Sequence, residues 1–455
     1  MSEVSLKRDL GLWTAVALVV GTVIGSGIFI VPNTMIRNVG TPGMVFVVWV
    51  VGGFMSLSGA LTYAELSAAM PGAGGEYVYL REAYGPMWSF LYGWTQMWVA
   101  KSGSIASLAT AFFLYVANFH PEVKQTVATI GAPIGPNGGP LEINLGQIFA
   151  MVLILLLGGM NYFGVKVGGN VQVLVTICKV SLILAVIVIG LGTGHGDMGN
   201  FQTSAPVLTS GVMAFFAALV AALWAYDGWN NVSMVASEIQ NPQRNLPLAL
   251  IGGSIAVMVI YLLANVAYFY VLPAAEVSSS SLVAADMMRK IGGQTGANAV
   301  SIAAMISIFA ALNGSILTGS RVPYAMAQDR LFFRPMAKVH PQFHTPGISI
   351  LALSAWSAVL VLSGRYEQLF TYVIFASWIL YGMTTAAVLV LRVKRPEMPR
   401  PYRTFGYPLI PIVFVLSALG LVISTLFNSP RESILGLLLV FAGLPFYFYW
   451  AKRRA

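Results

Sequence analysis

The stretch from Gly21 to Phe29, GTVIGSGIF, decides how the rest of the chain is interpreted. It lies in an apolar run over residues 11–36, which exceeds the roughly 20 residues that a helix needs to cross a bilayer. Glycine costs about 1 kcal/mol in a helix relative to alanine, and it lets other groups approach the backbone. The pattern Gly25-Ser26-Gly27 therefore predicts a spanning helix that is broken inside the membrane. Close packing of intact helices through small residues is the alternative, and this stretch alone does not decide between the two.

The composition of the whole chain is that of an integral membrane protein. Of its 455 residues, 57% are hydrophobic and 9% are charged, whereas soluble domains carry about 25% charged residues. The single cysteine, Cys178, rules out a disulfide framework and a cysteine-based metal site. Basic loops on one side of a membrane explain the net charge of +9 better than nucleic acid does. We expect no metal, no cofactor and no nucleic-acid partner.

Twelve apolar segments are predicted to be transmembrane helices. They cover residues 11–36, 43–69, 85–118, 144–162, 170–192, 208–238, 249–272, 294–325, 348–363, 367–392, 406–427 and 432–450. Of the 25 Lys and Arg residues, 16 fall in loops on the side of the N-terminus and six fall on the other side. Three basic residues lie within spans: Lys101, Lys179 and Arg321. Because cytoplasmic loops carry the excess of Lys and Arg, we expect a multi-pass protein of the cell (inner) membrane with both termini in the cytoplasm.

The sixth segment is the partner of the first. It contains WAYDGW, in which Asp227-Gly228 falls near the middle of an apolar span. Two interrupted segments that lie five segments apart indicate two halves of five helices with opposite topology, and a transport site at the midplane between them. We therefore predict an all-α membrane protein with a 5+5 inverted repeat in one integral membrane domain. Residues 1–192 form the first repeat, 208–392 the second, and 406–450 an appendage of two helices.

These motifs resemble those of amino acid permeases in the amino acid–polyamine–organocation superfamily. The resemblance is closest to the L-type amino acid transporter family and its bacterial relatives, and GTVIGSGIF and WAYDGWN look like the motifs of its first and sixth helices. Further stretches agree along almost the whole chain: PGAGGEYVYLREAYG (71–85), VQVLVTICK (171–179), SEIQNPQRNLPLAL (237–250), NGSILTGSRVPYAMAQDRLFF (313–333) and LRVKRPEMPRPYRTFGYPLIP (391–411). The resemblance implies a LeuT-type fold with helices 1 and 6 broken at the midplane, and amino acid transport by exchange. It does not imply an enzyme.

The resemblance places the substrate at the two breaks. Its carboxylate would lie on backbone amides of the first break, which suits an anion because helix N-termini carry unpaired N–H groups. Its ammonium would lie on carbonyls exposed by both breaks, and Trp224 would cover it as a gate rather than pack between helices. The predicted substrate-binding residues are Ile24, Gly25, Ser26, Gly27, Ile28, Trp224, Ala225, Asp227, Gly228, Tyr261 and Asn265.

Several of these residues have two interpretations. Asp227 would either pair with a cationic substrate side chain or cap the outer half of the sixth helix. Lys179 would occupy the place that a sodium ion takes in sodium-coupled relatives, or extend to an interface. Tyr261 and Asn265, one helical turn apart, would face the substrate or bond between helices.

Four further residues are charged and lie in or near the spans. We interpret Glu65 as structural and expect Arg321 to pair with it or with Asp329 at a cytoplasmic gate. The sequence offers no role for Lys101.

The expected function follows from the resemblance. It is sodium-independent exchange of neutral L-amino acids by alternating access, with cationic substrates left open by Asp227. Proton-coupled uptake of amino acids or of a polyamine is the alternative. Animal L-type members carry an outer cysteine that bonds to a heavy chain, whereas residues 119–143 contain none. We therefore expect amino acids and the bilayer as partners, and no disulfide-linked heavy chain.

Overall fold

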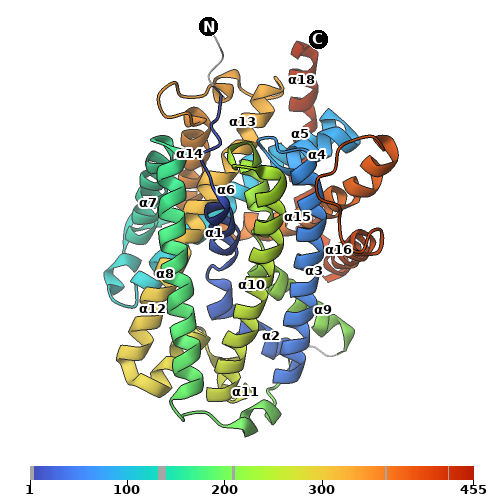
Figure 1. The fold of residues 1–455 in the computed structure, drawn as a ribbon. Coiled ribbons are helices and arrows are strands. Elements are labelled where there is room, and N and C mark those ends of the chain that lie inside the picture. The colour runs from blue at the N-terminus through green and yellow to red at the C-terminus, as the bar shows by residue number, and fades with distance from the viewer. Residues whose placement is uncertain (1–4, 132–139, 208–210, 364–365, 429, 455) are drawn as a thin grey trace.

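A computed structural model describes residues 5–131, 140–207, 211–363, 366–428 and 430–454. The chain forms a bundle of long helices, with short helices and loops at its two ends (Figure 1). The first elements are α1 (Leu12–Val23), α2 (Gly27–Val39), α3 (Pro42–Ala69), α4 (Glu76–Tyr84), α5 (Pro86–Thr95), the π-helical turn η1 (Gln96–Ala100), α6 (Lys101–Val116), η2 (Pro121–Lys124), β1 (Thr126–Ile130), β2 (Leu141–Asn144), α7 (Leu145–Tyr162), α8 (Val165–Gly192) and η4 (Met198–Gln202). The later elements are α9 (Val212–Tyr226), the 3-10 helix η5 (Trp229–Glu238), α10 (Pro242–Val271), α11 (Ala274–Ser279), α12 (Val283–Gly319), α13 (Arg321–Gln328), η6 (Arg334–Ala337), α14 (Gly347–Ser363), α15 (Tyr366–Lys394), α16 (Leu409–Asn428), α17 (Pro430–Phe441) and α18 (Leu444–Arg454).

The described chain contains ten helices that are long and apolar enough to cross a membrane, or eleven if the bent pair α1–α2 is one span. Each of the twelve predicted segments falls on one of these helices or on α14. Helix α14 is apolar but has only 17 residues, so it is shorter than the other spans. The structure therefore supports a polytopic helical membrane protein, and the count of twelve spans stays a prediction.

The first predicted break is present between α1 and α2. Helix α1 ends at Val23, α2 begins at Gly27, and the two axes differ by 41°. Ile24 has an extended backbone, with ψ of 93°, so the helical hydrogen-bond ladder cannot continue through it.

The second predicted break separates α9 from η5. Asp227 is extended and Gly228 has φ of +107°, a conformation that residues with a Cβ rarely adopt. The chain then continues as the 3-10 helix η5 instead of an α-helix.

The broken helices lie at the centre of the bundle. Helix α1 packs against α8, α10 and α12, while α2 packs against α9 (Figure 1). The buried share of each span's most apolar window falls from 78% in Val283–Gln328 to 22% in α16 and 17% in Ser433–Arg453. The two C-terminal spans are therefore peripheral, and the core surrounds the two breaks.

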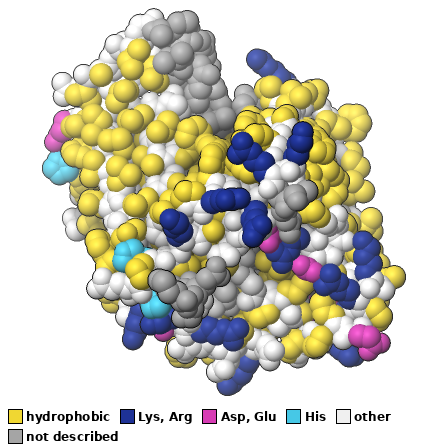
Figure 2. All heavy atoms as spheres, turned by 90° about the horizontal axis from the view of Figure 1, so that it is seen from above, with side chains coloured by type: hydrophobic (Ala, Val, Ile, Leu, Met, Phe, Trp, Pro, Cys, Tyr) yellow, Lys and Arg dark blue, Asp and Glu magenta, His cyan; other side chains and the backbone are white. Residues whose placement is uncertain are grey.

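Both termini lie at the same end of the bundle (Figure 1). Figure 2 looks down on that end and shows many Lys and Arg side chains across the face. The structure also contains a small antiparallel pair of strands, β1 and β2, in which Thr126 pairs with Asn144. These strands were not predicted from the sequence.

Candidate functional site

The two breaks lie directly against each other. A Cβ built on Gly27 would come within 2.9 Å of the Ala225 Cα atom, so only glycine lets α2 pack this closely on α9. The Thr22 hydroxyl donates to the Gly228 carbonyl oxygen at 2.9 Å. Residues far apart in the sequence thus meet at one point.

Tyr261 on α10 connects the ends of both broken helices. Its hydroxyl lies 2.9 Å from the Ala225 carbonyl oxygen and 3.1 Å from the Val23 carbonyl oxygen. Both carbonyls belong to the last turn of a helix, where backbone acceptors lack helical partners. Asn265 donates to the Tyr261 carbonyl at 2.8 Å, and its own Oδ1 atom is buried with no hydrogen-bond partner among the described residues.

Lys179 on α8 is fully buried and points at the end of α1. Its ammonium donates to the Gly21 carbonyl oxygen at 2.6 Å and to the Ile24 carbonyl oxygen at 2.5 Å. Ser307 on α12 donates to the same Ile24 oxygen at 3.0 Å. A cation is favoured at a helix C-terminus, because the last carbonyls carry partial negative charge. The side chain therefore stays inside the protein and does not extend to an interface.

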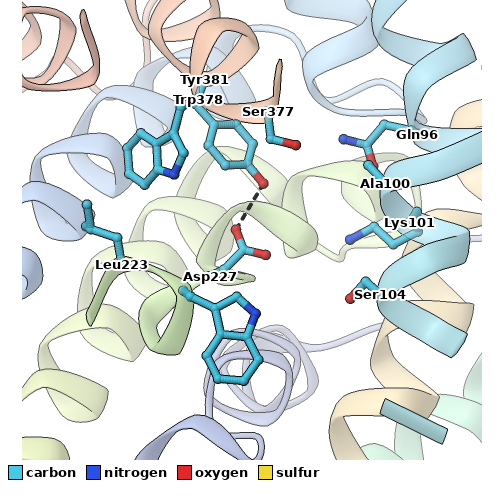
Figure 3. Close-up of a pocket in the computed structure, with 10 residues that line it drawn as sticks. Gln96, Ala100, Lys101, Ser104, Leu223, Asp227, Ser377, Trp378 and Tyr381 are labelled. Carbon is cyan, nitrogen blue, oxygen red and sulfur yellow. Dashed lines mark hydrogen bonds between the residues drawn. The ribbon is translucent and has the colours of Figure 1, made fainter. Parts of the chain in front are cut away.

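A pocket opens beside the second break (Figure 3). It is enclosed by η1 and α6 on one side, by the end of α9 below, and by α15 above. Its lining residues are Gln96, Ala100, Lys101, Ser104, Leu223, Trp224, Asp227, Ser377, Trp378 and Tyr381. Of the predicted substrate residues, it brings together only Trp224 and Asp227. Residues 24–28 are all buried and do not line it.

Asp227 points into this pocket. Its Oδ1 atom accepts a hydrogen bond of 3.0 Å from the Tyr381 hydroxyl, as Figure 3 shows. Gly228, not Asp227, occupies the residue position that caps η5. The arrangement therefore favours the interpretation of Asp227 as a pocket residue over that of a helix cap.

Trp224 lies between the pocket and the first break. Its side chain lines the pocket, and its Cζ3 atom would be 3.6 Å from a Cβ on Gly27. The indole of Trp224 therefore contacts both the pocket and the surroundings of Gly27. Trp229 behaves differently: it is buried and packs edge-on against Tyr63, with ring centroids 4.7 Å apart.

Lys101 is a pocket residue to which the sequence gave no role. It begins α6 and faces the pocket from the side opposite Asp227 (Figure 3). Its ammonium donates to the Oδ1 atom of Asn231, on η5, at 2.6 Å. The sequence did contain a signal for this role, because a lysine in the middle of an apolar span raises the free energy of the protein in the membrane unless it has a partner or a function.

Glu76, on the short helix α4 outside the spans, is a buried acid that sequence reasoning missed. It accepts hydrogen bonds from Tyr92 at 2.5 Å, from Tyr63 at 3.3 Å and from Asn230. Burial raises the pKa of the Glu76 carboxyl, and the bonds from Tyr92 and Asn230 act against that rise. Because Asn230 and Asn231 are neighbours on η5, α4 and α6 hold the same short helix from two sides.

Arg321, at the start of α13, does not pair with either predicted partner. Arg321 forms a fully buried ion pair with Glu238, at 2.7 Å and 2.9 Å, and pairs with neither Glu65 nor Asp329. Glu65 instead binds Arg392 at 2.7 Å. The expectation failed because sequence distance does not indicate which helix ends meet in the fold.

Asp329 pairs with Arg81 and not with Arg321. It accepts a hydrogen bond of 2.6 Å from Arg81 and one of 2.9 Å from the Tyr77 hydroxyl. Within the described ranges, no group of three or more His, Cys, Asp or Glu residues could hold a metal ion.

Comparison with known proteins agrees with this architecture. Residues 10–445 match the amino acid permease family. The chain is 34% identical to the serine/threonine exchanger SteT of Bacillus subtilis (strain 168), over 99% of this chain and 98% of that protein. It is 31% identical to the b(0,+)-type amino acid transporter 1 of Homo sapiens, over 99% of this chain and 89% of that protein. Identity to the cystine/glutamate transporter of Homo sapiens is 29%, over 99% and 87%. The chain therefore belongs to the amino acid permease family, in the L-type branch of the amino acid–polyamine–organocation superfamily, and is a transporter and not an enzyme.

Proposed function

We propose that this protein is a sodium-independent exchanger of neutral L-amino acids that works by alternating access in the cell membrane. The observation that carries the proposal is the buried ammonium of Lys179 on the Gly21 and Ile24 carbonyls. Ser307 shares the Ile24 carbonyl, so the cation lies where α1, α8 and α12 meet. A cation that belongs to the protein removes the need for a bound sodium ion there.

The proposed substrate position joins the two breaks to the pocket. The substrate carboxylate would accept hydrogen bonds from amides at the start of α2, around Ser26 and Gly27, because a helix N-terminus favours an anion. The ammonium would lie near the carbonyl end of α9, at Trp224 and Ala225, because the Ile24 carbonyl already accepts from Lys179 and Ser307. The side chain would extend toward Asp227 in the pocket, and Trp224 would move to let the substrate through.

The proposed architecture is the 5+5 inverted repeat with α14 as a spanning helix. Residues 1–192 and 208–392 form the halves, residues 406–450 the appendage, and both termini are cytoplasmic. The basic face at the end that carries both termini supports this orientation (Figure 2). We propose that the protein works without a disulfide-linked heavy chain, because residues 119–143 contain no cysteine.

Counterflow in proteoliposomes tests the function. Vesicles loaded with unlabelled serine should take up labelled serine far faster than empty vesicles, and replacement of sodium by choline should leave the rate unchanged. Sodium-dependent uptake into empty vesicles would contradict the proposal. Vesicles without protein provide the background rate.

Proton-coupled uptake of an amino acid or a polyamine is the competing function, and the Asp227 carboxylate in the pocket is what favours a cationic substrate. A pH gradient imposed across empty vesicles separates the two functions. Under the proposed exchange, the gradient should drive no accumulation of serine or spermidine.

A further inference from the structure

Two side chains of opposite charge face each other across the pocket beside the second break. Lys101 enters it from the start of α6 and Asp227 from the end of α9 (Figure 3). The other lining residues with a hydroxyl or carboxamide side chain are Gln96, Ser104, Ser377 and Tyr381. Hydroxyl and amide groups of the lining therefore surround one positive and one negative charge. The buried Glu76 lies behind Lys101, outside the lining, because it binds Asn230, the neighbour of the Asn231 that holds Lys101.

Neither charge is neutralised by direct contact. Among the described residues, neither Lys101 nor Asp227 forms an ion pair within 4.0 Å, and each is held by a neutral partner. Asn231 accepts from Lys101 at 2.6 Å, and Tyr381 donates to Asp227 at 3.0 Å. An ammonium has three donors and a carboxylate has two acceptor oxygens, so each retains hydrogen-bonding capacity that a ligand can use.

The balance of charge decides which ligand groups the pocket favours. A cationic group that approaches Asp227 is repelled by Lys101, and an anionic group that approaches Lys101 is repelled by Asp227. A neutral group that can donate and accept avoids both repulsions: it donates to the carboxylate and accepts from the ammonium. Hydroxyl and carboxamide side chains have this property, whereas purely aliphatic side chains leave both charges without a new partner.

We propose that Lys101 and Asp227 together form a charge-balanced side-chain site that selects amino acids with small hydroxyl or carboxamide side chains and rejects cationic and anionic ones. This inference rests on the proposed function, because it assumes that the substrate lies at the two breaks with its side chain in this pocket. Lys101 acts here as a specificity-determining residue, and Asp227 does not act alone as a partner for cations.

Competition for labelled serine in proteoliposomes tests the proposal. Serine, threonine and asparagine should compete best in the wild-type protein, alanine less well, and arginine and glutamate poorly. Lys101→Met should raise the competition of arginine relative to serine by about tenfold or more, because Asp227 is then unopposed. Asp227→Asn should raise that of glutamate relative to serine in the same way.

The double variant and two controls complete the experiment. Lys101→Met combined with Asp227→Asn should again reject both charged substrates, and Lys101→Arg should retain the wild-type order because it keeps the charge. Lys124→Met removes an exposed lysine far from the pocket in sequence and should change no ratio. Size-exclusion profiles show which variants are folded, and if Lys101→Met is not, Asp227→Asn carries the test through its glutamate ratio.

Unchanged arginine and glutamate ratios in variants that still transport serine would overturn the selectivity proposal and leave the exchange function standing. Failure of every amino acid to exchange in the wild-type protein would instead overturn the proposed function itself. Strong competition by arginine in the wild-type protein would also refute the charge balance.

Discussion

Lys179 is the residue whose removal should have the largest consequence. Lys179→Ala takes a donor from the Gly21 and Ile24 carbonyls inside the protein. Leaving a buried acceptor unsatisfied costs about 1–3 kcal/mol, so we expect lower thermal stability in detergent. We also expect exchange to fall at least tenfold, because the end of α1 loses the group that fixes it.

Ser307 provides the matched control for Lys179. Ser307→Ala removes the second donor to Ile24, but the ammonium of Lys179 still satisfies that carbonyl. Its effect on stability and exchange should therefore be much smaller. Equal losses in the two variants would show that the ammonium is not the main link between α8 and α1.

Gly27 should tolerate substitution less well than Gly25. A Cβ on Gly27 would lie 2.9 Å from both the Cα and Cβ atoms of Ala225, whereas the nearest atoms to a Cβ on Gly25 would be 3.8 Å away or farther. We expect Gly27→Ala to lower the thermal unfolding temperature by several degrees, because α2 must move away from α9. Gly25→Ala should unfold within a degree of the wild-type protein, and equal shifts would contradict the packing argument.

The sequence predicted which residues belong to the site better than it predicted which residues contact one another. The glycines at 25, 27 and 228 indicated the breaks because glycine has a local conformational signature. The role of Lys101 could not be inferred, because Asn231 and Asp227 approach it only through the fold.

At the scale of elements, Tyr261 should control how firmly the two broken helices are held together. Its hydroxyl is shared between the last carbonyls of α1 and α9. Tyr261→Phe keeps the ring but removes that donor, which should cost about 1–3 kcal/mol because the acceptors are buried. Thermal unfolding in detergent should show a lower midpoint, and the exchange rate should fall.

Tyr115 offers a comparison of the same chemistry without the contact. Its hydroxyl is buried but has no hydrogen-bond partner among the described residues. Tyr115→Phe should therefore leave stability unchanged or slightly raised, since no bond is lost. If both substitutions gave the same loss, the link between the helices would not be the cause.

The positions of the breaks could be predicted, but their packing could not. Each break could be located from a short local stretch: the first from its glycines, and the second from a glycine beside an intramembrane acid. The continuation of α9 as a 3-10 helix, and the pairing of Arg321 with Glu238, depend on contacts between distant segments. Local patterns carry no information on such contacts.

For the whole molecule, the basic end face predicts the orientation in the membrane. A protease-sensitive tag fused to the C-terminus should be cleaved in inside-out vesicles and protected in intact spheroplasts, because loops rich in Lys and Arg stay in the cytoplasm. A tag inserted after Gly131, beyond strand β1, should show the reverse pattern. Cleavage of the C-terminal tag in spheroplasts would contradict the proposed topology.

Most of the fold could be predicted from the sequence, because the length of an apolar segment is a local property that identifies a membrane helix. The predicted segments fall on helices throughout, including the interrupted first and sixth. The prediction was weakest for α14, whose 17 residues are barely enough to cross a bilayer. It also missed the strands β1 and β2, which lie in a loop outside the apolar segments.

The buried ammonium of Lys179 also bears on energy supply. A cation covalently attached to α8 cannot travel across the membrane with the cargo, unlike a sodium ion held at the same carbonyls. In the proposed exchange, one zwitterion replaced by another moves no net charge. A membrane potential, worth about 2.3 kcal/mol per charge at 100 mV, would then neither drive nor oppose the cycle. The direction of net flux would depend only on the concentration ratios of the two amino acids. The energy for accumulating one amino acid would therefore come from the process that keeps the other at a high concentration inside the cell.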